Sequence, residues 1–235
     1  MPLGQVKYTT MTVNLYIGHD EKMATNTHVM IDSILEYTTV PVRISLIQTH
    51  LIKEYTRPIH PNQSTSFSFS RFLVPYLNNY QGWALFMDSD MLFLDDIAKL
   101  WNLKDSKFDV QVVQHADYVC NNSNKFFNIQ QTNYLKKNWS SVMLFNCANC
   151  TRLTPEYVNT ATPAELHQFM WTNNVGALDP KWNYLVGEAS SHDPSVAVLH
   201  YTYGTPLYTN NCPVELKNIW EQRLKNLFKF TDSKL

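Results

Sequence analysis

The residues best suited to binding or catalysis are two aspartates, separated by one residue, in an apolar stretch. Asp88 and Asp90 flank Ser89, follow the apolar run 83–87 and precede a second apolar run at 91–94. In an extended chain, residues i and i+2 point to the same side, so the two carboxylates can converge. Carboxylates held that close repel each other unless a cation lies between them, and oxygen ligands of this kind suit Mg²⁺ or Mn²⁺. The pattern predicts a divalent-metal site, and the alternative is a pair of solvated turn aspartates.

Two other groups of residues could also take part in binding or catalysis. His200 lies at the end of the apolar segment 196–201 and can be a third metal ligand or an ordinary hydrogen-bonded histidine. Gly204, a few residues later, fits either a phosphate contact or a plain turn. Arg71 follows a run of hydroxyl residues at 64–70, where it can bind a phosphate or a carboxylate, or form a salt bridge on a helix face.

The elements that must position these residues alternate between strand and helix patterns. We expect strands at 12–17, 42–47, 83–87, 108–113, 141–145 and 196–201. We expect helices at 23–35, 67–80 and 97–103, after Thr154, after Thr162 and from Pro213, and Pro75 must start a turn or kink the helix at 67–80. Asp95 and Asp96 precede the helix at 97 as N-cap candidates, and Thr162 with Glu165 forms a capping box. This order favours an α/β sandwich with a mixed, mostly parallel sheet, and Asp88 then falls at the carboxyl end of a strand, where such sheets bind ligands.

Length and composition exclude several functional classes. The chain has 235 residues, a net charge of −1 and only six glycines, no two of them within ten positions. That spacing excludes a Walker A loop, a GxGxxG dinucleotide fingerprint and a GxSxG nucleophile elbow. The neutral charge balance argues against a nucleic-acid partner.

Other features of the sequence bear on organisation and location. We expect one domain over 1–235, ending in an amphipathic helix at 213–230. No apolar run reaches the ~18 residues of a membrane span, and the first residues lack a signal-peptide pattern, so we expect a cytoplasmic protein. Cys147 and Cys150 form one CxxC pair, which we interpret as buried thiols rather than as half of a zinc site.

Seven segments that together cover most of the chain follow one another in a recognisable order. They are YIGHD at 16–20, STSFSFSRFLVPYL at 64–77, GWALFMDSDMLFLDDIAKLW at 82–101, KNWSSVMLFN at 137–146, LTPEYVNTAT at 153–162, KWNYLVGE at 181–188 and LHYTYGTP at 199–206. In this order they resemble the GT-A glycosyltransferases of the glycogenin and lipopolysaccharide-galactosyltransferase kind, which form glycosyltransferase family eight. The similarity is greatest to compact bacterial-type members of that family.

This resemblance implies a Rossmann-like GT-A fold and a metal-dependent hexosyltransferase. The enzyme would use Mn²⁺ or Mg²⁺ to move a sugar from a UDP- or GDP-linked donor to a hydroxyl of a glycan or glycolipid acceptor, with retention of configuration. The family's Lys-Pro-Trp after the late glycine has no counterpart, because Pro206 is followed by Leu207. The family's acidic segment near the sugar also has no clear match, so the donor sugar and the source of a diphosphate-binding lysine stay open.

The resemblance also implies roles for particular residues. The metal ligands would be Asp88, Asp90 and His200, and the catalytic residues would be the two aspartates with Arg71 near the donor diphosphate. The nucleotide-binding residues would be Ile17, Gly18, His19, Asp20, Ser89 and Gly204. The residues near the sugar or acceptor would be Ser141, Asn146, Trp182, Asn183 and Tyr203.

Two other functions compete with the transferase. A sugar-1-phosphate nucleotidyltransferase would be expected to carry a glycine-rich N-terminal loop, which this chain lacks. A catalytically weak carbohydrate- or nucleotide-binding module could retain the same scaffold. The closing helix carries Lys217, Arg223, Lys225 and Lys229 beside its apolar face, so it can pack on its own domain or contact the inner face of a membrane.

Overall fold

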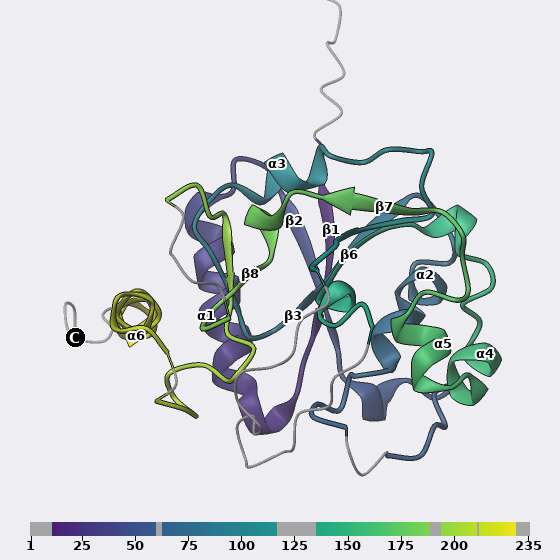
Figure 1. Cartoon of the computed structure of the whole chain (residues 1–235), viewed down its shortest axis with the longest axis horizontal. Coiled ribbons are helices and arrows are strands. Elements are labelled where there is room, and N and C mark those ends of the chain that lie inside the picture. The colour runs from purple at the N-terminus through teal and green to yellow at the C-terminus, as the bar shows by residue number, and fades with distance from the viewer. Residues whose placement is uncertain (1–10, 60–62, 117–134, 189–193, 211, 229–235) are drawn as a thin grey trace, which may run out of the picture.

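A six-stranded mixed sheet with helices on both faces forms the centre of the protein (Figure 1). The computed structural model describes residues 11–59, 63–116, 135–188, 194–210 and 212–228. The sheet has the strand order β2-β1-β3-β6-β5-β7. Its strands are β1 (Val13–Gly18), β2 (Val42–Ile47), β3 (Trp83–Asp88), β5 (Val110–Val113), β6 (Val142–Asn146) and β7 (Val175–Leu178). A smaller sheet, in the order β4-β9-β8, contains β4 (Met91–Phe93), β8 (Tyr184–Leu185) and β9 (Val198–His200).

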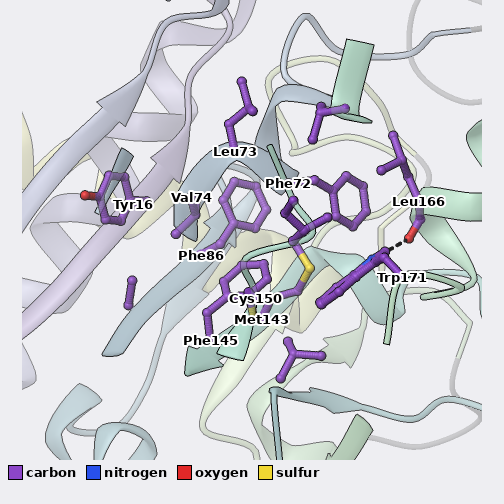
Figure 2. Packing of buried hydrophobic residues seen from close by; sticks show 14 of the residues in the cluster. Tyr16, Phe72, Leu73, Val74, Phe86, Met143, Phe145, Cys150, Leu166 and Trp171 are labelled. Carbon is purple, nitrogen blue, oxygen red and sulfur yellow. Dashed lines mark hydrogen bonds between the residues drawn. The ribbon is translucent and has the colours of Figure 1, made fainter. Parts of the chain in front are cut away.

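Alternate residues of the central strands pack into two different cores. Ala84 and Phe86 of β3 face one core, whereas Leu85 and Met87 face the other. Helix α1 (Ala24–Tyr37) lies on the second side, while α2 (Val74–Leu77), α4 (Pro155–Thr160) and α5 (Pro163–His167) lie on the first (Figure 1). Figure 2 shows the first core, where Phe86 and Phe145 pack with Phe72 and Trp171. Because both faces are covered, β3 is a continuous apolar run instead of an alternating one.

Strand direction determines which residues reach the edge of the sheet that carries Asp88. Strands β1, β2 and β3 run parallel, with Gly18 opposite Asp88. Strand β6 is antiparallel to both of its neighbours, so its first residue, Val142, lies beside Met87. This edge therefore combines the ends of β1, β3 and β5 with the start of β6, and the expected mixed sheet is confirmed.

The predicted helix starts are confirmed by their caps. Helix α3 (Ile97–Trp101) begins after Asp96, whose carboxylate accepts a hydrogen bond from the Ala98 N–H. Thr154 caps α4, and Thr162 with Glu165 forms a complete capping box on α5. These caps are local interactions over two or three residues, which is why the sequence predicts them well.

The segment 67–80 is helical only in part, and Pro75 starts a turn there, which is one of the two roles expected of it. The structure has a 3-10 turn, η3 (Ser70–Leu73), and then the single-turn helix α2, and the segment ends with Asn79 and Tyr80 at positive φ. Proline 75 can only occupy a first helical turn, so it starts α2 instead of lying inside a longer helix. Strands β4, β7 and β8 were not expected from the sequence.

The closing helix α6 (Val214–Phe228) packs on its own domain, alongside α1 (Figure 1). Trp220 and Leu216 are buried in a third core, and Arg223 forms salt bridges with Asp32 and Glu36 of α1. Residues 229 and 230, predicted to belong to this helix, lie outside the described residues. Among the described helices, none is both long and apolar enough to span a bilayer.

The CxxC residues are buried thiols, as expected. Cys147 and Cys150 are free, and burial raises the pKa of Cys147 to about 12. Burial also raises the pKa of Cys150, whose Sγ lies 3.2 Å from the carbonyl of Asp109. Because the thiolate is the metal-binding and nucleophilic form, these two residues are suited to packing and not to chemistry.

Candidate metal centre

Three side chains from two different sheets meet at the carboxyl end of β3. Asp88 is the last residue of β3, Asp90 precedes β4, and His200 ends β9. The antiparallel pairing of β4 with β9 places Met91 opposite His200, which brings the histidine beside the aspartates. One ligand atom from each of the three lies within 4.8 Å of the others, and His200 Nε2 is 3.4 Å from Asp90 Oδ1.

This donor set fits a divalent cation. Atoms bonded to one ion at about 2.0–2.4 Å can be at most roughly 4–4.8 Å apart, which is the spacing found here. Two carboxylate oxygens and one imidazole nitrogen suit Mg²⁺ or Mn²⁺, with the imidazole favouring the transition metal. Three protein ligands leave coordination positions for oxygen atoms of another molecule. The predicted metal ligands are therefore brought together, whereas metal binding and the identity of the ion stay predictions.

Arg71 contacts one of the predicted ligands directly. Its Nη1 lies 2.9 Å from Asp88 Oδ1 and donates to the carbonyl of Ser140, also at 2.9 Å. The buried guanidinium lies close to two aromatic rings, 5.3 Å from the centre of Phe67 and 5.1 Å from that of Phe86. The described partners of Arg71 are thus a carboxylate and a backbone carbonyl, and its contact with a donor diphosphate stays a prediction. A carboxylate has lone pairs for several partners, so this contact leaves Asp88 able to bind a metal.

His200 is held by Asn183, a residue that the resemblance places near the sugar and not behind a metal ligand. Its Nδ1 lies 2.8 Å from Asn183 Oδ1, and Asn183 follows the 3-10 turn η7 (Pro180–Trp182). The amide nitrogen of Asn183 donates to Ser141 Oγ at 2.8 Å and to the carbonyl of Asn138 at 3.2 Å. Asn183 is fully buried and Ser141 nearly so, so both predicted sugar contacts lie behind the metal ligands.

The other residues predicted near the sugar have different positions. Asn146 is a correction: it pairs with Trp83 at the start of β3, five residues from Asp88, or roughly 16 Å at about 3.3 Å per residue. Because β6 is antiparallel, its carboxyl end runs away from the metal ligands. Trp182 is buried in the core on the α1 side of the sheet, and the buried Tyr203 donates its hydroxyl to Glu188.

The residues predicted to bind the nucleotide lie near the end of the sheet that carries Asp88, but several of them are buried or hydrogen-bonded within the protein. Ile17 is buried in the core, and Asp20 caps a 3-10 turn and accepts from the Ser66 N–H at 2.9 Å. His19 Nδ1 lies 2.9 Å from Thr27 Oγ1. Two more of these residues have backbone or burial constraints: Gly204 has φ of 109° and Ser89 is buried. Their contact with a nucleotide stays a prediction.

His115 is a residue of this edge that the sequence analysis did not single out. It follows β5 by two residues and interacts electrostatically with His200. Burial, with a smaller contribution from His200, lowers the pKa of His115 to about 4. Its position in a polar stretch without periodicity gave no signal, because only the pairing of β5 with β6 brings it to this edge.

The lowered pKa of His115 predicts a loss of stability in mild acid. Below about pH 6.5 the unfolded chain binds a proton at this histidine, whereas the folded protein binds it only near pH 4. The free energy of unfolding should therefore fall as the pH falls through this window, by about 1–2 kcal/mol between pH 7 and pH 5. Urea unfolding of the metal-free wild type and His115→Gln at both pH values tests this. An equal pH dependence in the two proteins would contradict it.

Comparison with solved structures identifies the class of fold. The bifunctional glycosyltransferase WbbM aligns with a TM-score of 0.63 and 13% identity over 95% of this chain, which spans about half of WbbM (51%). Galactosyltransferase LgtC, solved with donor and acceptor sugar analogues, aligns with a TM-score of 0.62 and 12% identity over 92% of this chain and 96% of LgtC. GlyE of Streptococcus pneumoniae TIGR4 also gives a TM-score of 0.62, with 12% identity over 95% of this chain and 67% of GlyE. The chain has the GT-A glycosyltransferase fold.

Sequence comparison then identifies the family. No protein-family model matches the chain. Protein CDI of Arabidopsis thaliana is 38% identical over 226 residues, which cover 92% of this chain and 87% of that protein. The chain belongs to the same family as Protein CDI.

Proposed function

We propose that the protein is a metal-dependent glycosyltransferase that moves a sugar from a nucleotide-diphosphate donor to a hydroxyl acceptor. The observation that carries this proposal is the convergence of Asp88, Asp90 and His200 at the carboxyl edge of a GT-A sheet. The resemblance to family eight extends the proposal to a UDP- or GDP-linked donor, Mn²⁺ or Mg²⁺ as the ion, a glycan or glycolipid acceptor and retention of configuration.

The chemistry of the transfer explains why such a site is needed. Breaking the bond between the sugar and the diphosphate leaves negative charge on the departing group. A divalent ion bound by the three ligands would neutralise that charge. Arg71 holds the Asp88 carboxylate in place through their ion pair. The turn that contains Gly204 comes four residues after His200, so its backbone could approach the diphosphate.

A panel of UDP- and GDP-sugars with Mn²⁺, read out as released UDP or GDP, tests the function. We expect slow hydrolysis of one donor by the wild type and a loss of at least about 100-fold in Asp90→Asn, because one ligand and one charge are removed. Asp95→Asn is the matched control, since Asp95 pairs with Lys99 on the next helix and does not contact the candidate metal ligands in any described interaction. Thermal unfolding of each variant verifies that it is folded.

Two outcomes would contradict the proposal. Metal-dependent nucleotide binding without turnover of any donor would favour the binding module. Formation of a nucleotide-sugar from a nucleoside triphosphate and a sugar-1-phosphate would favour the nucleotidyltransferase.

A further inference from the structure

The hydrogen bonds behind His200 determine which of its two ring nitrogens carries the proton. The starting point is Ser141, whose hydroxyl donates to the carbonyl of Asn138 at 2.6 Å. A hydroxyl has one hydrogen, so towards Asn183 the oxygen of Ser141 can only accept. The carbonyl of Asn138 is also purely an acceptor. The group of Asn183 that faces both of them must therefore be its NH₂, at 2.8 and 3.2 Å.

The orientation of the Asn183 amide then fixes the histidine. With its NH₂ used in this way, Asn183 presents its Oδ1 to His200, and an amide oxygen can only accept. His200 Nδ1 therefore donates across the 2.8 Å contact. In the neutral ring the other nitrogen, Nε2, carries the lone pair, and this is the atom 3.4 Å from Asp90 Oδ1.

The alternative arrangements of the neutral ring are both worse. With the proton on Nε2, two acceptors would face each other at 2.8 Å between His200 and Asn183. Turning the Asn183 amide over would cure that contact but would set its oxygen against the carbonyl of Asn138 and the oxygen of Ser141. Since Asn183 has no exposed surface, water cannot replace the lost bonds.

The same short turn also supports the second ligand. Residue Asn138 has a left-handed backbone, with φ of 62°, and leads into η5 (Trp139–Ser141). The carbonyl of Ser140 in this turn accepts from Arg71, which contacts Asp88. The turn at 138–141 thus binds both supporting side chains: Arg71, which contacts Asp88, and Asn183, which contacts His200.

We propose that Asn183 is a positioning residue that holds His200 as the Nδ1–H tautomer, so that Nε2 is ready to bind a divalent cation. This inference rests on the metal site of the proposed function, but it assigns Asn183 and Ser141 to the support of a metal ligand instead of to contact with sugar. Partners of this kind, lying behind a metal-bound histidine, typically change metal affinity about 10- to 100-fold when removed.

The first test is ¹⁵N NMR of the histidine side chains in the metal-free protein at pH 8, which shows for each ring nitrogen whether it carries a proton. His200 is assigned by its absence from His200→Gln. We expect a single Nδ1–H tautomer in the wild type and a mixture of tautomers in Asn183→Leu. An Nε2–H tautomer in the wild type would overturn the proposal directly, whether or not any variant folds.

The second test is titration with Mn²⁺ alone, followed by the electron paramagnetic resonance signal of free Mn²⁺. We expect affinity to fall about 10- to 100-fold in Asn183→Leu and a few-fold in Ser141→Ala, because Asn183 then keeps the carbonyl of Asn138 as an acceptor. The matched control is Asn78→Leu, which removes a half-buried amide bonded to Asn14 and to Gln81 near the opposite edge of the sheet. Unchanged affinity in a folded Asn183→Leu would refute the role of Asn183.

The two tests separate this proposal from the proposed function. Neither uses a sugar donor, so a protein with a fixed tautomer and Asn183-dependent Mn²⁺ binding supports the proposal even if no donor is turned over. A wild type that binds no Mn²⁺ but shows the fixed tautomer would contradict the metal-dependent transferase. In that case the assignment of the His200 tautomer would be correct, and its proposed role in metal binding would be wrong.

Discussion

Replacing Arg71 by methionine should lower the free energy of unfolding by about 3 kcal/mol, because it leaves the Asp88 carboxylate without its buried cation. The pair is largely shielded from water, with side-chain exposures of 8% for Arg71 and 15% for Asp88. Methionine keeps the apolar contact with Phe67 and Phe86, so the change tests mainly the charge. Urea unfolding at pH 7 measures the effect.

A double-mutant cycle separates the ion pair from general damage. Asp88→Asn in the Arg71→Met background should recover much of the lost stability, because the uncompensated charge is gone. Lys99→Met is the matched control: it breaks an exposed pair with Asp95 and should cost only about 0.3–0.5 kcal/mol. If Arg71→Met cost no more than Lys99→Met, the buried pair would have no special role in holding Asp88.

The sequence predicts the convergence of Asp88 and Asp90 well because their geometry is mainly local. Asp88 and Asp90 are two residues apart at the end of an apolar strand, and that spacing alone brings the carboxylates together. The capping box of Thr162 and Glu165 is local in the same sense. His200 needed one more fact, the pairing of β4 with β9, which the resemblance supplied indirectly through the order of the segments.

The residues that support the ligands could not be predicted in the same way. Asn183 bonds to partners 42 and 45 residues away in the sequence, and nothing in the composition of its segment distinguishes this from contact with a ligand. Asn146 was misplaced because an apolar run at 142–145 does not report the direction of its strand. In an antiparallel β6 the edge near Asp88 receives Ser141, and Asn146 goes to the opposite edge.

Replacing Gly18 by alanine should damage both stability and the proposed activity, although the change adds a single methyl group. A Cβ at Gly18 would lie 2.3 Å from Cδ2 of Phe67, far inside van der Waals contact. Phe67 has little room to withdraw, since it is 2% exposed and packs against Phe86. Overpacking of this kind costs about 1–3 kcal/mol. Urea unfolding and the released-nucleotide assay measure the two effects.

The effect on activity follows from the contact of the Phe67 ring with Arg71. That ring is 5.3 Å from the guanidinium of Arg71, so moving it disturbs the group that holds Asp88, while Gly18 itself pairs with Asp88 in the sheet. A displacement of about 1 Å at a reacting centre can reduce turnover about 100-fold, so we expect activity to fall by more than the loss of stability explains. In Gly18→Ala with Phe67→Leu, the smaller side chain should make room and restore part of both.

Gly176→Ala is the control that separates these two effects. Its Cβ would lie 2.5 Å from Phe108, a clash of the same type, but Gly176 lies on β7, the outermost strand of the sheet, away from Arg71. It should lower stability while leaving turnover per folded molecule unchanged. Equal losses of turnover in both alanine variants would mean that overpacking anywhere in the sheet disturbs the metal ligands. A loss confined to Gly18→Ala and partly restored by Phe67→Leu would locate the sensitivity in the contact from Gly18 through Phe67 to Arg71 and Asp88.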